Sequence, residues 1–302
     1  MTDFFDEAIS RFESGDPAEA RRLFHGRGFF YPGQEHLVIN WFPPYLQVIN
    51  YQPAEHLLSK HDLIGFSEAI KSSQGLVLQS RAGRRINNEI LCGQIPEKHV
   101  TQELGQRYWV RLLDNQNVGL FLDMGHVRAW LAPRVFGKKV LNLFSYTCAF
   151  SVSVLANGAK SIVNIDMSKN AIEWGKENHL LNNLDFRGVT MLPHNIFRSW
   201  WKIKQLGSYD VIIIDPPTNQ RGSFNAEKNY GQILKRIPTF AEKGAVVVAC
   251  LNSPFLGREF LINQMARWCP ACRLIEDLGP HPDFPDAYPE RGLKVLAFNY
   301  EG

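Results

Sequence analysis

The stretch Val140-Leu-Asn-Leu-Phe-Ser-Tyr-Thr-Cys-Ala-Phe-Ser151 decides the fold of this chain. Residues 140–144 form a short apolar run of the kind that becomes a buried strand. The run ends at Ser145-Tyr-Thr147, where a hydroxyl side chain can cap a helix, and apolar residues recur at helical spacing from Phe150 onward. The stretch therefore predicts a strand, a turn and a helix in succession.

A second apolar strand, Ser161-Ile-Val-Asn-Ile-Asp166, ends in an acid about 20 residues after this turn. In a doubly wound sheet, an acid at this distance reaches the hydroxyl groups of a bound ribose. The turn contains no glycine, so the G-x-G-x-x-G fingerprint of dinucleotide binding is absent. We interpret residues 140–166 as a ligand-binding strand–helix–strand unit without the signature of an NAD site.

The composition of the chain is that of a globular protein with a substantial core. It has 302 residues, of which 45% are hydrophobic and 21% are charged, and its net charge is +3. That length allows one large or two ordinary domains. The mild positive charge permits a nucleic-acid partner without arguing for one. The chain has no apolar run of the roughly 18 residues that a membrane span needs, so no membrane partner is expected.

The first residues and the cysteines indicate a cytoplasmic protein. The N-terminal residues are acidic rather than basic, so a secretory signal is not expected. Five cysteines are an odd number for a disulfide framework and fit a reducing compartment. Cys269 and Cys272 have C-x-x-C spacing, but no second pair completes a zinc site, so we expect two reduced thiols and no metal site. A homodimer remains open.

Residues 1–115 are predicted to form an α+β domain that is a candidate for recognition of RNA or another substrate. The expected elements are a helix over 3–24 with an interruption at Asp16-Pro17, strands at 36–41 and 46–51, a helix over 53–73, a strand at 75–79 and a loop over 86–102. Arg21, Arg22 and Arg27 cluster beside His25 at the end of the first helix. A solvated helix face is the preferred interpretation, and an RNA contact is the alternative.

Residues 116–302 are predicted to form an α/β domain. Around its start we expect a strand at 108–113 that continues at 118–123, and then a helix over 124–136. The strands expected after them are 140–144, 161–166, 188–192, 209–214, 245–249 and 293–299. Strands that alternate with helices indicate a mainly parallel, doubly wound, Rossmann-like sheet with helices on both faces. The strand 209–214 is the most apolar of the set, which predicts a central position in the sheet.

Polar residues follow four consecutive strands of this domain. They are Ser145 to Thr147, Asp166, Asn195 and Asp215. Ligands of open parallel sheets bind outside the carboxyl ends of the strands, so these residues are the candidates for a nucleoside-binding site. Asp166 can accept hydrogen bonds from two ribose hydroxyls or can cap a helix, and Asn195 can accept from an adenine amino group or form a turn. Met167 can lie against an adenine ring.

The tripeptide Asp215-Pro216-Pro217 is the most specific of these strand ends. Two consecutive prolines cannot continue a hydrogen-bonded ladder, so they fix the path by which the chain leaves the sheet. The backbone carbonyl groups there become rigid acceptors that face the site. A turn alone would explain the prolines but not the acid or its place.

These motifs together resemble the bacterial 23S ribosomal RNA methyltransferases, which are class I, S-adenosylmethionine-dependent enzymes that modify guanine N7 or cytosine C5. The matching segments are Phe144-Ser-Tyr-Thr147, Asp166-Met-Ser168 with Glu173-Trp174, Asp215-Pro-Pro-Thr218, Gly119-Leu-Phe-Leu-Asp123 and His281-Pro-Asp-Phe284. The likeness is closest to the guanine-N7 branch and covers residues 105–250 best. It implies a class I methyltransferase sheet preceded by a smaller α+β domain, and large-subunit ribosomal RNA as the partner.

The resemblance also implies a role for each strand end. Phe144, Ser145, Tyr146 and Thr147 would wrap the methionine part of S-adenosylmethionine. Asp166 would bind the ribose of the cofactor, and Met167 and Asn195 would bind its adenine. Asp215, Pro216 and Pro217 would line the point of methyl transfer, where Asp215 would also contact the cofactor.

Four positions depart from the family pattern. Cys148 stands where glycine is usual, Ala149 where glycine or serine is frequent, Asn195 where an acid is usual, and Gly125 where an arginine is expected, although Arg128 is kept. A β-carbon at position 148 is expected to narrow the approach to the ligand. These departures leave open a methyltransferase-like module that binds RNA or an assembly partner without catalysis.

The target atom depends on which side chains reach the base. Guanine N7 has a free lone pair and needs no general base, whereas cytosine C5 needs a thiolate that adds to the ring. The residue after the prolines is Thr218, whereas cytosine C5 chemistry would need a thiol and transfer to an exocyclic amine would use an aromatic ring. Cys250 is expected to be a structural thiol. Guanine N7 is therefore preferred and cytosine C5 is the alternative. Phe224, Tyr230 and Phe284 are candidates to stack on an extruded base, although core packing or loop anchoring is the preferred interpretation for each of them.

Overall fold

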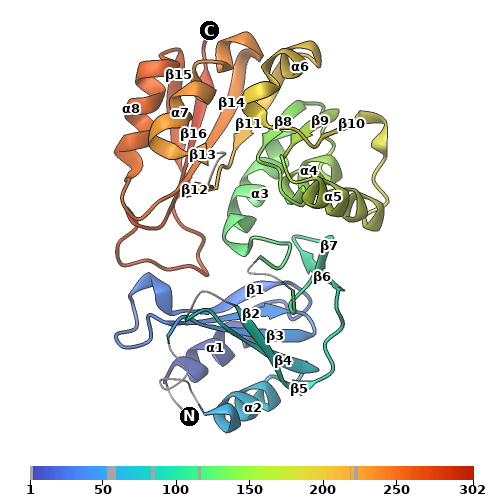
Figure 1. Cartoon of the computed structure of the whole chain (residues 1–302), viewed down its shortest axis with the longest axis vertical. Helices are drawn as coiled ribbons and strands as arrows, with labels where there is room; N and C mark the ends of the chain where they lie inside the picture. The colour runs from blue at the N-terminus through green and yellow to red at the C-terminus, as the bar shows by residue number, and fades with distance from the viewer. Residues whose placement is uncertain (1–2, 53–58, 83–85, 115–116, 218, 221–223) are drawn as a thin grey trace. The chain divides into compact units, whose positions relative to one another are not determined.

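The computed structural model describes residues 3–52, 59–82, 86–114, 117–217, 219–220 and 224–302, and the chain forms two compact units (Figure 1). Unit 1 comprises Met1–Gly125 and His281–Tyr288, and unit 2 comprises His126–Pro280 and Pro289–Gly302. No helix in the described ranges is long and apolar enough to cross a membrane. The division falls after Gly125 rather than after residue 115, and unit 1 includes a short C-terminal segment that the sequence did not assign to it.

Unit 1 is built on a five-stranded sheet in the order β1-β2-β3-β4-β5. Its strands are β1 (Arg21–His25), β2 (Leu37–Phe42), β3 (Tyr45–Asn50), β4 (Gly75–Ser80) and β5 (Asn87–Gly93). Helices α1 (Asp3–Glu13) and α2 (Lys60–Ala69) lie on the same side of this sheet (Figure 1). Phe4 and Phe5 of α1 and Phe66 of α2 enter one buried cluster with the strands, and the rings of Phe5 and Phe66 stack 4.8 Å apart. A hairpin of β6 (His99–Glu103) and β7 (Gln106–Val110) completes the unit.

Two sequence predictions in unit 1 are wrong. Residues 21–25 form strand β1 rather than the end of a helix, because Leu23 and Phe24 are buried while the strand pairs antiparallel with β2. Residues 86–102 contain β5 and most of β6 rather than a loop. In β5 the exposed and half-buried side chains hide the alternation that would have revealed it. The expected strand pair at 36–51 is confirmed as β2 and β3.

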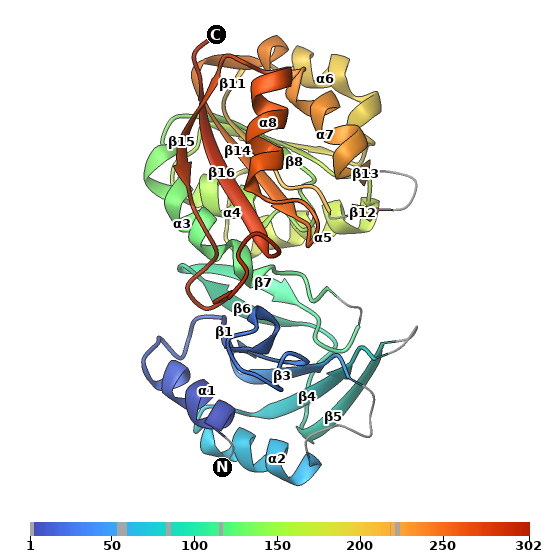
Figure 2. The same cartoon turned by 90° about the vertical axis from the view of Figure 1, so that its left-hand side faces the viewer.

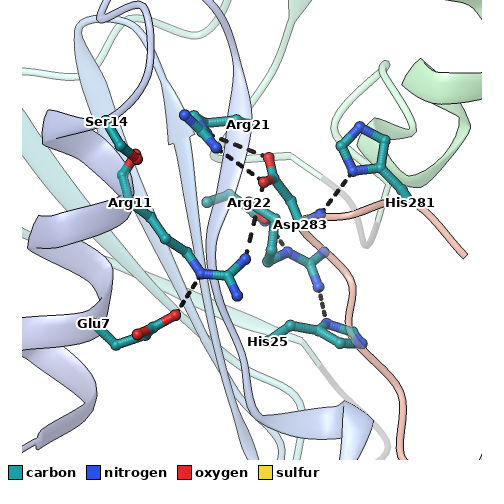
Figure 3. A network of polar contacts seen from close by, with 9 residues as sticks. Glu7, Arg11, Ser14, Arg21, Arg22, His25, His281 and Asp283 are labelled. Atoms are coloured by element: carbon teal, nitrogen blue, oxygen red, sulfur yellow. Dashed lines mark hydrogen bonds and ion pairs between the residues drawn. The ribbon is translucent and has the colours of Figure 1, made fainter.

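The segment His281–Tyr288 packs against α1 and β1 within unit 1 (Figure 3). Asp283 accepts hydrogen bonds from Arg21, with Nη2 and Oδ1 2.9 Å apart, and the Arg11 guanidinium lies 3.9 Å from the same oxygen. The Arg22 guanidinium lies 4.2 Å from the centre of the Phe284 ring. This segment therefore belongs to unit 1, although residues 126–280 separate it from the rest of that unit in the chain.

Unit 2 contains a seven-stranded sheet in the order β10-β9-β8-β11-β14-β16-β15, which Figure 1 shows from right to left. Its strands are β8 (Lys139–Leu143), β9 (Ser161–Ile165), β10 (Val189–Leu192), β11 (Tyr209–Ile214), β14 (Ala241–Asn252), β15 (Cys272–Asp277) and β16 (Leu293–Tyr300). The first five are parallel to one another, and β16 runs antiparallel to β14 and β15. The central place of β11 is confirmed. The expected strand at 118–123 is wrong, and β15, with five exposed residues, was missed.

Helices cover both faces of this sheet, which confirms the doubly wound, Rossmann-like fold. The helices are α3 (Gly125–Leu131), α4 (Ala149–Ala156), α5 (Lys169–Leu181), α6 (Trp200–Gln205), α7 (Ala226–Leu234) and α8 (Arg258–Trp268). Leu141, Ile212 and Val247 face one side, where they share a core with residues of α6, α7 and α8. Figure 2 shows α8 lying along β14 and β16. Asn142 and Asn164 alternate with these residues and face α4 and α5.

Short segments connect these elements. A two-residue ladder joins β12 (Asn219–Gln220) to β13 (Phe224–Asn225). Within the described ranges, 3-10 turns are formed by Gly26–Gly28, Leu122–Met124, Ala132–Arg134, Phe186–Gly188, Ile196–Arg198 and Ile237–Thr239.

Candidate functional site

The carboxyl ends of β10, β9, β8 and β11 lie level with one another. Leu143 is in register with both Ile165 and Ile214, and Ile165 is in register with Leu192. Backbone hydrogen bonds continue past these residues: Ser145 donates to the Ile165 carbonyl (3.0 Å), Asp166 to that of Leu192 (3.2 Å) and Asp215 to that of Leu143 (3.5 Å). The predicted strand-end residues are therefore brought together along one edge of the sheet.

The turn between β8 and α4 has an unusual backbone. Phe144, Tyr146 and Cys148 all have φ in the left-handed region, at 62°, 46° and 62°. None of them is glycine, and this conformation costs an ordinary residue about 1–2 kcal/mol. Such strain persists only where the surroundings hold it, and it concentrates at binding and catalytic sites. The turn is therefore the part of the edge most clearly shaped for a ligand.

Two side chains hold this turn in place. The Asp166 carboxylate accepts hydrogen bonds from the backbone N–H of Tyr146 (2.9 Å) and of Ser168 (2.8 Å). The buried Asn178 of α5 donates to the Thr147 carbonyl at 3.0 Å. Burial raises the pKa of the Asp166 carboxyl group, and the two N–H donors oppose that rise. Asp166 does not cap α5, because Ser168 does so by accepting from the Ala171 N–H.

A buried chain of hydrogen bonds supports the turn from below. Asn142 donates to Asn164 (2.9 Å), and Asn164 donates to the Ser151 hydroxyl (2.9 Å). Ser151 lies 2.8 Å from His179 Nε2, and His179 Nδ1 lies 2.7 Å from the Gly175 carbonyl oxygen. A carbonyl oxygen only accepts, so Nδ1 carries a proton, and in the neutral ring Nε2 accepts from the Ser151 hydroxyl. Burial lowers the pKa of His179, which favours that neutral form.

The side chain of Cys148 lies against α5. A β-carbon placed on Gly175 would be 2.6 Å from the Cys148 sulfur, so the thiol takes the space that glycine leaves open. The sulfur also lies 3.8 Å from the Tyr146 carbonyl oxygen, and burial raises the pKa of this thiol to about 12. The residue is fully buried. The prediction that its side chain narrows the approach to a ligand is wrong, because the side chain occupies a pocket of the core instead.

The two residues predicted to bind adenine, Met167 and Asn195, differ in how exposed they are. Met167 is 48% exposed directly after β9. Asn195 caps the 3-10 turn that follows β10, because its side-chain oxygen accepts from the Phe197 N–H at 2.9 Å. The turn-forming alternative for Asn195 is thus realised, and one lone pair of that oxygen remains for another donor.

The residues after β11 differ in exposure, and the aromatic candidates are buried. Asp215 is half-buried, Pro216 is buried and Pro217 is exposed, while Thr218 lies outside the described residues. Phe224, Tyr230 and Phe284 are 3%, 0% and 9% exposed. The preferred interpretation, that these rings are packed inside the protein, is confirmed, and the alternative of stacking on a base is not supported. Phe224 packs edge-on against Phe144 with the ring centres 5.3 Å apart.

The N-terminal arginines do not form a solvated helix face, so that preferred interpretation is wrong. Arg22 donates to Asn40 (2.6 Å) and to His25 Nδ1 (2.5 Å), as Figure 3 shows for the histidine. Burial, with the nearby charges of Arg22 and Arg27, lowers the pKa of His25 to about 3, so its ring is a neutral acceptor. The Arg27 guanidinium stacks 4.1 Å from the centre of the Tyr51 ring.

The remaining predictions concern Gly125 and metals. A side chain at Gly125 would approach Glu103, whose Oε1 lies 3.1 Å from the ideal β-carbon position. Arg128 is buried and lies 5.5 Å from the Phe150 ring centre. Across the described ranges, no group of three or more His, Cys, Asp or Glu side chains could hold a metal ion.

Comparison with known proteins gives one family match that spans almost the whole chain. A family model described as "S-adenosylmethionine-dependent methyltransferase" matches residues 21–299. That range includes every strand end described above and the strands of the five-stranded and seven-stranded sheets, apart from Tyr300, the last residue of β16.

Curated relatives have related names. The chain is 35% identical over 156 residues to "Ribosomal RNA large subunit methyltransferase K/L" of Psychrobacter sp. (strain PRwf-1). This alignment covers 49% of this chain and 19% of the relative. Over 262 residues it is 29% identical to YwbD of Bacillus subtilis (strain 168), provisionally named a ribosomal RNA large subunit methyltransferase, covering 82% of this chain and 65% of YwbD. The chain thus spans about a fifth of the length of the first relatives it matches.

Solved structures share the fold. SMU.776, described as a methyltransferase complexed with SAH, superposes with a TM-score of 0.87 at 23% identity, over 98% of this chain and 80% of its own. A methyltransferase structure from Streptococcus mutans gives 0.86 at 23% identity, over 99% of this chain and 81% of its own. At this identity the likeness establishes the fold of both units.

Proposed function

Because the chain belongs to the S-adenosylmethionine-dependent methyltransferase family, we propose that it methylates a base of 23S ribosomal RNA, with guanine N7 as the target atom. The names of the curated relatives support a large-subunit ribosomal RNA substrate. The arrangement of the site supports the proposed roles of the strand-end residues and the proposed target atom.

The strand-end residues fit the cofactor. The Ser145 hydroxyl is buried and makes no hydrogen bond of normal geometry with any described group, as expected of a group that awaits a ligand. We assign Phe144, Ser145, Tyr146 and Thr147 to the methionine part. Each oxygen of Asp166 accepts one backbone hydrogen bond and keeps a lone pair for a ribose hydroxyl. Met167, which is half exposed, and the Asn195 oxygen would face the adenine.

The bound cofactor supplies an electrophilic methyl group on a sulfonium. The work of the chain is to align this group with the base and to exclude water. The strained turn fixes the donor side, because Asp166 and Asn178 hold its backbone. On the acceptor side, Asp215, Pro216 and Pro217 follow the central strand and would line the transfer point with carbonyl groups that the prolines hold rigid.

The burial of the cysteines is the observation that favours guanine N7 over cytosine C5 as the target atom. A C5 enzyme needs a thiolate that reaches the ring. Cys250 is fully buried inside β14, in register with Val295 of β16. Cys148 is fully buried against α5, and Cys269 and Cys272 lie at the far end of α8, after Trp268. Cys92 belongs to unit 1. All five cysteines are among the described residues, and none is exposed at the carboxyl edge of the sheet.

An assay with labelled cofactor tests this function. The purified protein is incubated with methyl-labelled S-adenosylmethionine and 23S ribosomal RNA from a strain that lacks it. We expect incorporation at one nucleotide, where borohydride reduction and aniline treatment then cleave the chain, as N7-methylguanine requires. A mark that resists this cleavage and protects a cytosine from bisulfite would establish the C5 alternative. Cofactor binding without any transfer would establish the non-catalytic module.

A further inference from the structure

We infer that Phe255, in the loop after β14, is the aromatic platform on which the target base stacks during methyl transfer. The inference rests on the proposed function and names the side chain that receives the substrate. The three aromatic residues considered from the sequence, Phe224, Tyr230 and Phe284, are not available for stacking, because their rings are buried.

Phe255 lies at the carboxyl end of a strand next to the proposed transfer point. Strand β14 is the parallel neighbour of β11, with Ile214 in register with Ala249. The residue after Ile214 is Asp215, which opens the Asp-Pro-Pro segment, and β14 continues to Asn252. The loop from Ser253 to Gly257 therefore leaves the sheet at the edge that carries the candidate site.

The Phe255 ring is almost entirely in water. Its side chain is 91% exposed, more than any other large hydrophobic residue in the described ranges. A single exposed apolar side chain is ordinary on protein surfaces. Phe255 differs from such residues because hydrogen bonds hold its loop at both ends, which fixes the position of the exposed ring.

The first anchor is a buried lysine. Lys294 of β16 is 5% exposed, and its ammonium group donates to the Ser253 carbonyl (2.5 Å) and to the Glu290 carbonyl (3.0 Å). Ser253 is itself 5% exposed, and its hydroxyl accepts from the Phe255 N–H at 3.3 Å. Burying an ammonium group is costly unless it is well paired, so this position is specified strongly.

The second anchor lies just after the loop. The Arg258 N–H donates to Glu290 Oε2 at 2.7 Å, and the Arg258 guanidinium pairs with Asp277 at 2.9 Å. Gly257 lets the chain pass close to this carboxylate, because a β-carbon there would be 2.5 Å from the same oxygen. Lys294 and Glu290 thus hold both ends of a five-residue loop that carries one exposed aromatic ring.

A nucleobase is the ligand that this arrangement fits. A base must leave its stack before its edge can meet the cofactor, and proteins replace the lost stacking with an aromatic side chain. Stacking tolerates any base, because every base has a flat π face. The specificity for one atom would then come from the Asp215 edge, while Phe255 supplies affinity.

The test compares Phe255→Ala with Phe255→Trp and with a matched control. Phe136→Ala removes an 82% exposed ring that precedes β8, at the amino end of the sheet. Single-turnover transfer to 23S ribosomal RNA, RNA affinity and cofactor affinity are measured for each variant. We expect Phe255→Ala to lower RNA affinity or kcat/KM by about 5- to 150-fold. Phe255→Trp should restore transfer, and Phe136→Ala should match the wild type. Cofactor affinity should stay unchanged throughout.

The outcomes separate the two claims. A wild-type protein that transfers no methyl group to RNA would overturn the proposed function, and the inference with it. An active wild type whose Phe255→Ala variant equals Phe136→Ala would overturn the inference alone. Loss of cofactor affinity in Phe255→Ala would show that the loop shapes the cofactor site instead, and would also overturn it.

Discussion

The sulfur atom of Cys148 lies 2.6 Å from the position that a β-carbon would take on Gly175, so the thiol and a side chain at position 175 would clash. Cys148, which has a left-handed backbone in the turn at 144–148, is therefore matched by a glycine in α5 that leaves room for its side chain. The turn keeps its shape, and α5 approaches it closely enough for Asn178 to hold the Thr147 carbonyl.

This pairing predicts a change of sign in a double-mutant cycle. Gly175→Ala in the wild type should destabilise the fold by about 1–3 kcal/mol, because the core is overpacked against the sulfur. In a Cys148→Gly background the same change should be neutral or stabilising, because alanine favours helices over glycine. Chemical denaturation measures both. Gly65→Ala is the control, since Gly65 lies in α2 with no atom near its β-carbon position, and it should stabilise by about 0.5–1 kcal/mol. Equal effects of Gly175→Ala in both backgrounds would contradict the pairing.

Removal of the Asp166 carboxylate should weaken cofactor binding. Asp166→Ala loses the ribose acceptor and frees the Tyr146 N–H, so we expect the Kd for S-adenosylmethionine to rise about 10- to 150-fold, as for the loss of a charged hydrogen bond. Calorimetry measures it. Asp185→Asn is a matched control, because Asp185 also accepts from a backbone N–H, that of Arg187, but precedes β10 at the other end of the strand. Asp166→Ala with the wild-type Kd would rule out this role.

Replacement of Cys250 distinguishes the two target atoms. Because Cys250 is buried within β14, Cys250→Ala should leave methyl transfer within about threefold of wild type after correction for folded protein, a change of well under 1 kcal/mol. The folded fraction comes from circular dichroism. Transfer that disappears while the variant remains folded and binds cofactor would instead favour the cytosine-C5 reaction.

Stability should fall below neutral pH because His179 is held neutral. Its folded pKa is lower than the unfolded value of about 6.5, so the unfolded chain binds more protons as pH falls through that value. The stability that the neutral ring provides is present above pH about 6.5 and is lost progressively below it. His25 acts in the same direction.

His179→Phe isolates the contribution of this one ring. Between pH 6.5 and 5, its slope of unfolding free energy against pH should be smaller than that of wild type, by up to about 1.4 kcal/mol per pH unit. Denaturation at a series of pH values measures the slope. The same slope in both proteins would show that His179 does not titrate on unfolding.

The strand ends of unit 2 could be predicted from sequence because the signals are local. The strands end at Leu143, Ile165, Leu192 and Ile214, and polar residues follow each end within three positions. In a parallel sheet, neighbouring strands bring such residues to one edge whatever the loops do. The turn at 144–148 could also be located, although its three left-handed residues could not be anticipated without glycine as a signal.

The parts that were missed depend on contacts between distant residues. Arg21 and Asp283 pair across 262 positions, so nothing near Arg21 shows that its partner exists. The burial of Phe224 and Tyr230 depends on the packing of Phe144, α7 and α8, which composition does not reveal. Phe255 looked like any aromatic residue after a strand, because its significance lies in its exposure and in the buried Lys294 that fixes its loop.

The most direct test of the account is a comparison of methyl groups in 23S ribosomal RNA from three strains of the source organism. One lacks this protein, one expresses the wild type, and one expresses Asp166→Ala at the same level. The account predicts that one N7-methylguanine is present only in the strain with the wild-type protein. The same set of methyl groups in all three strains would contradict it.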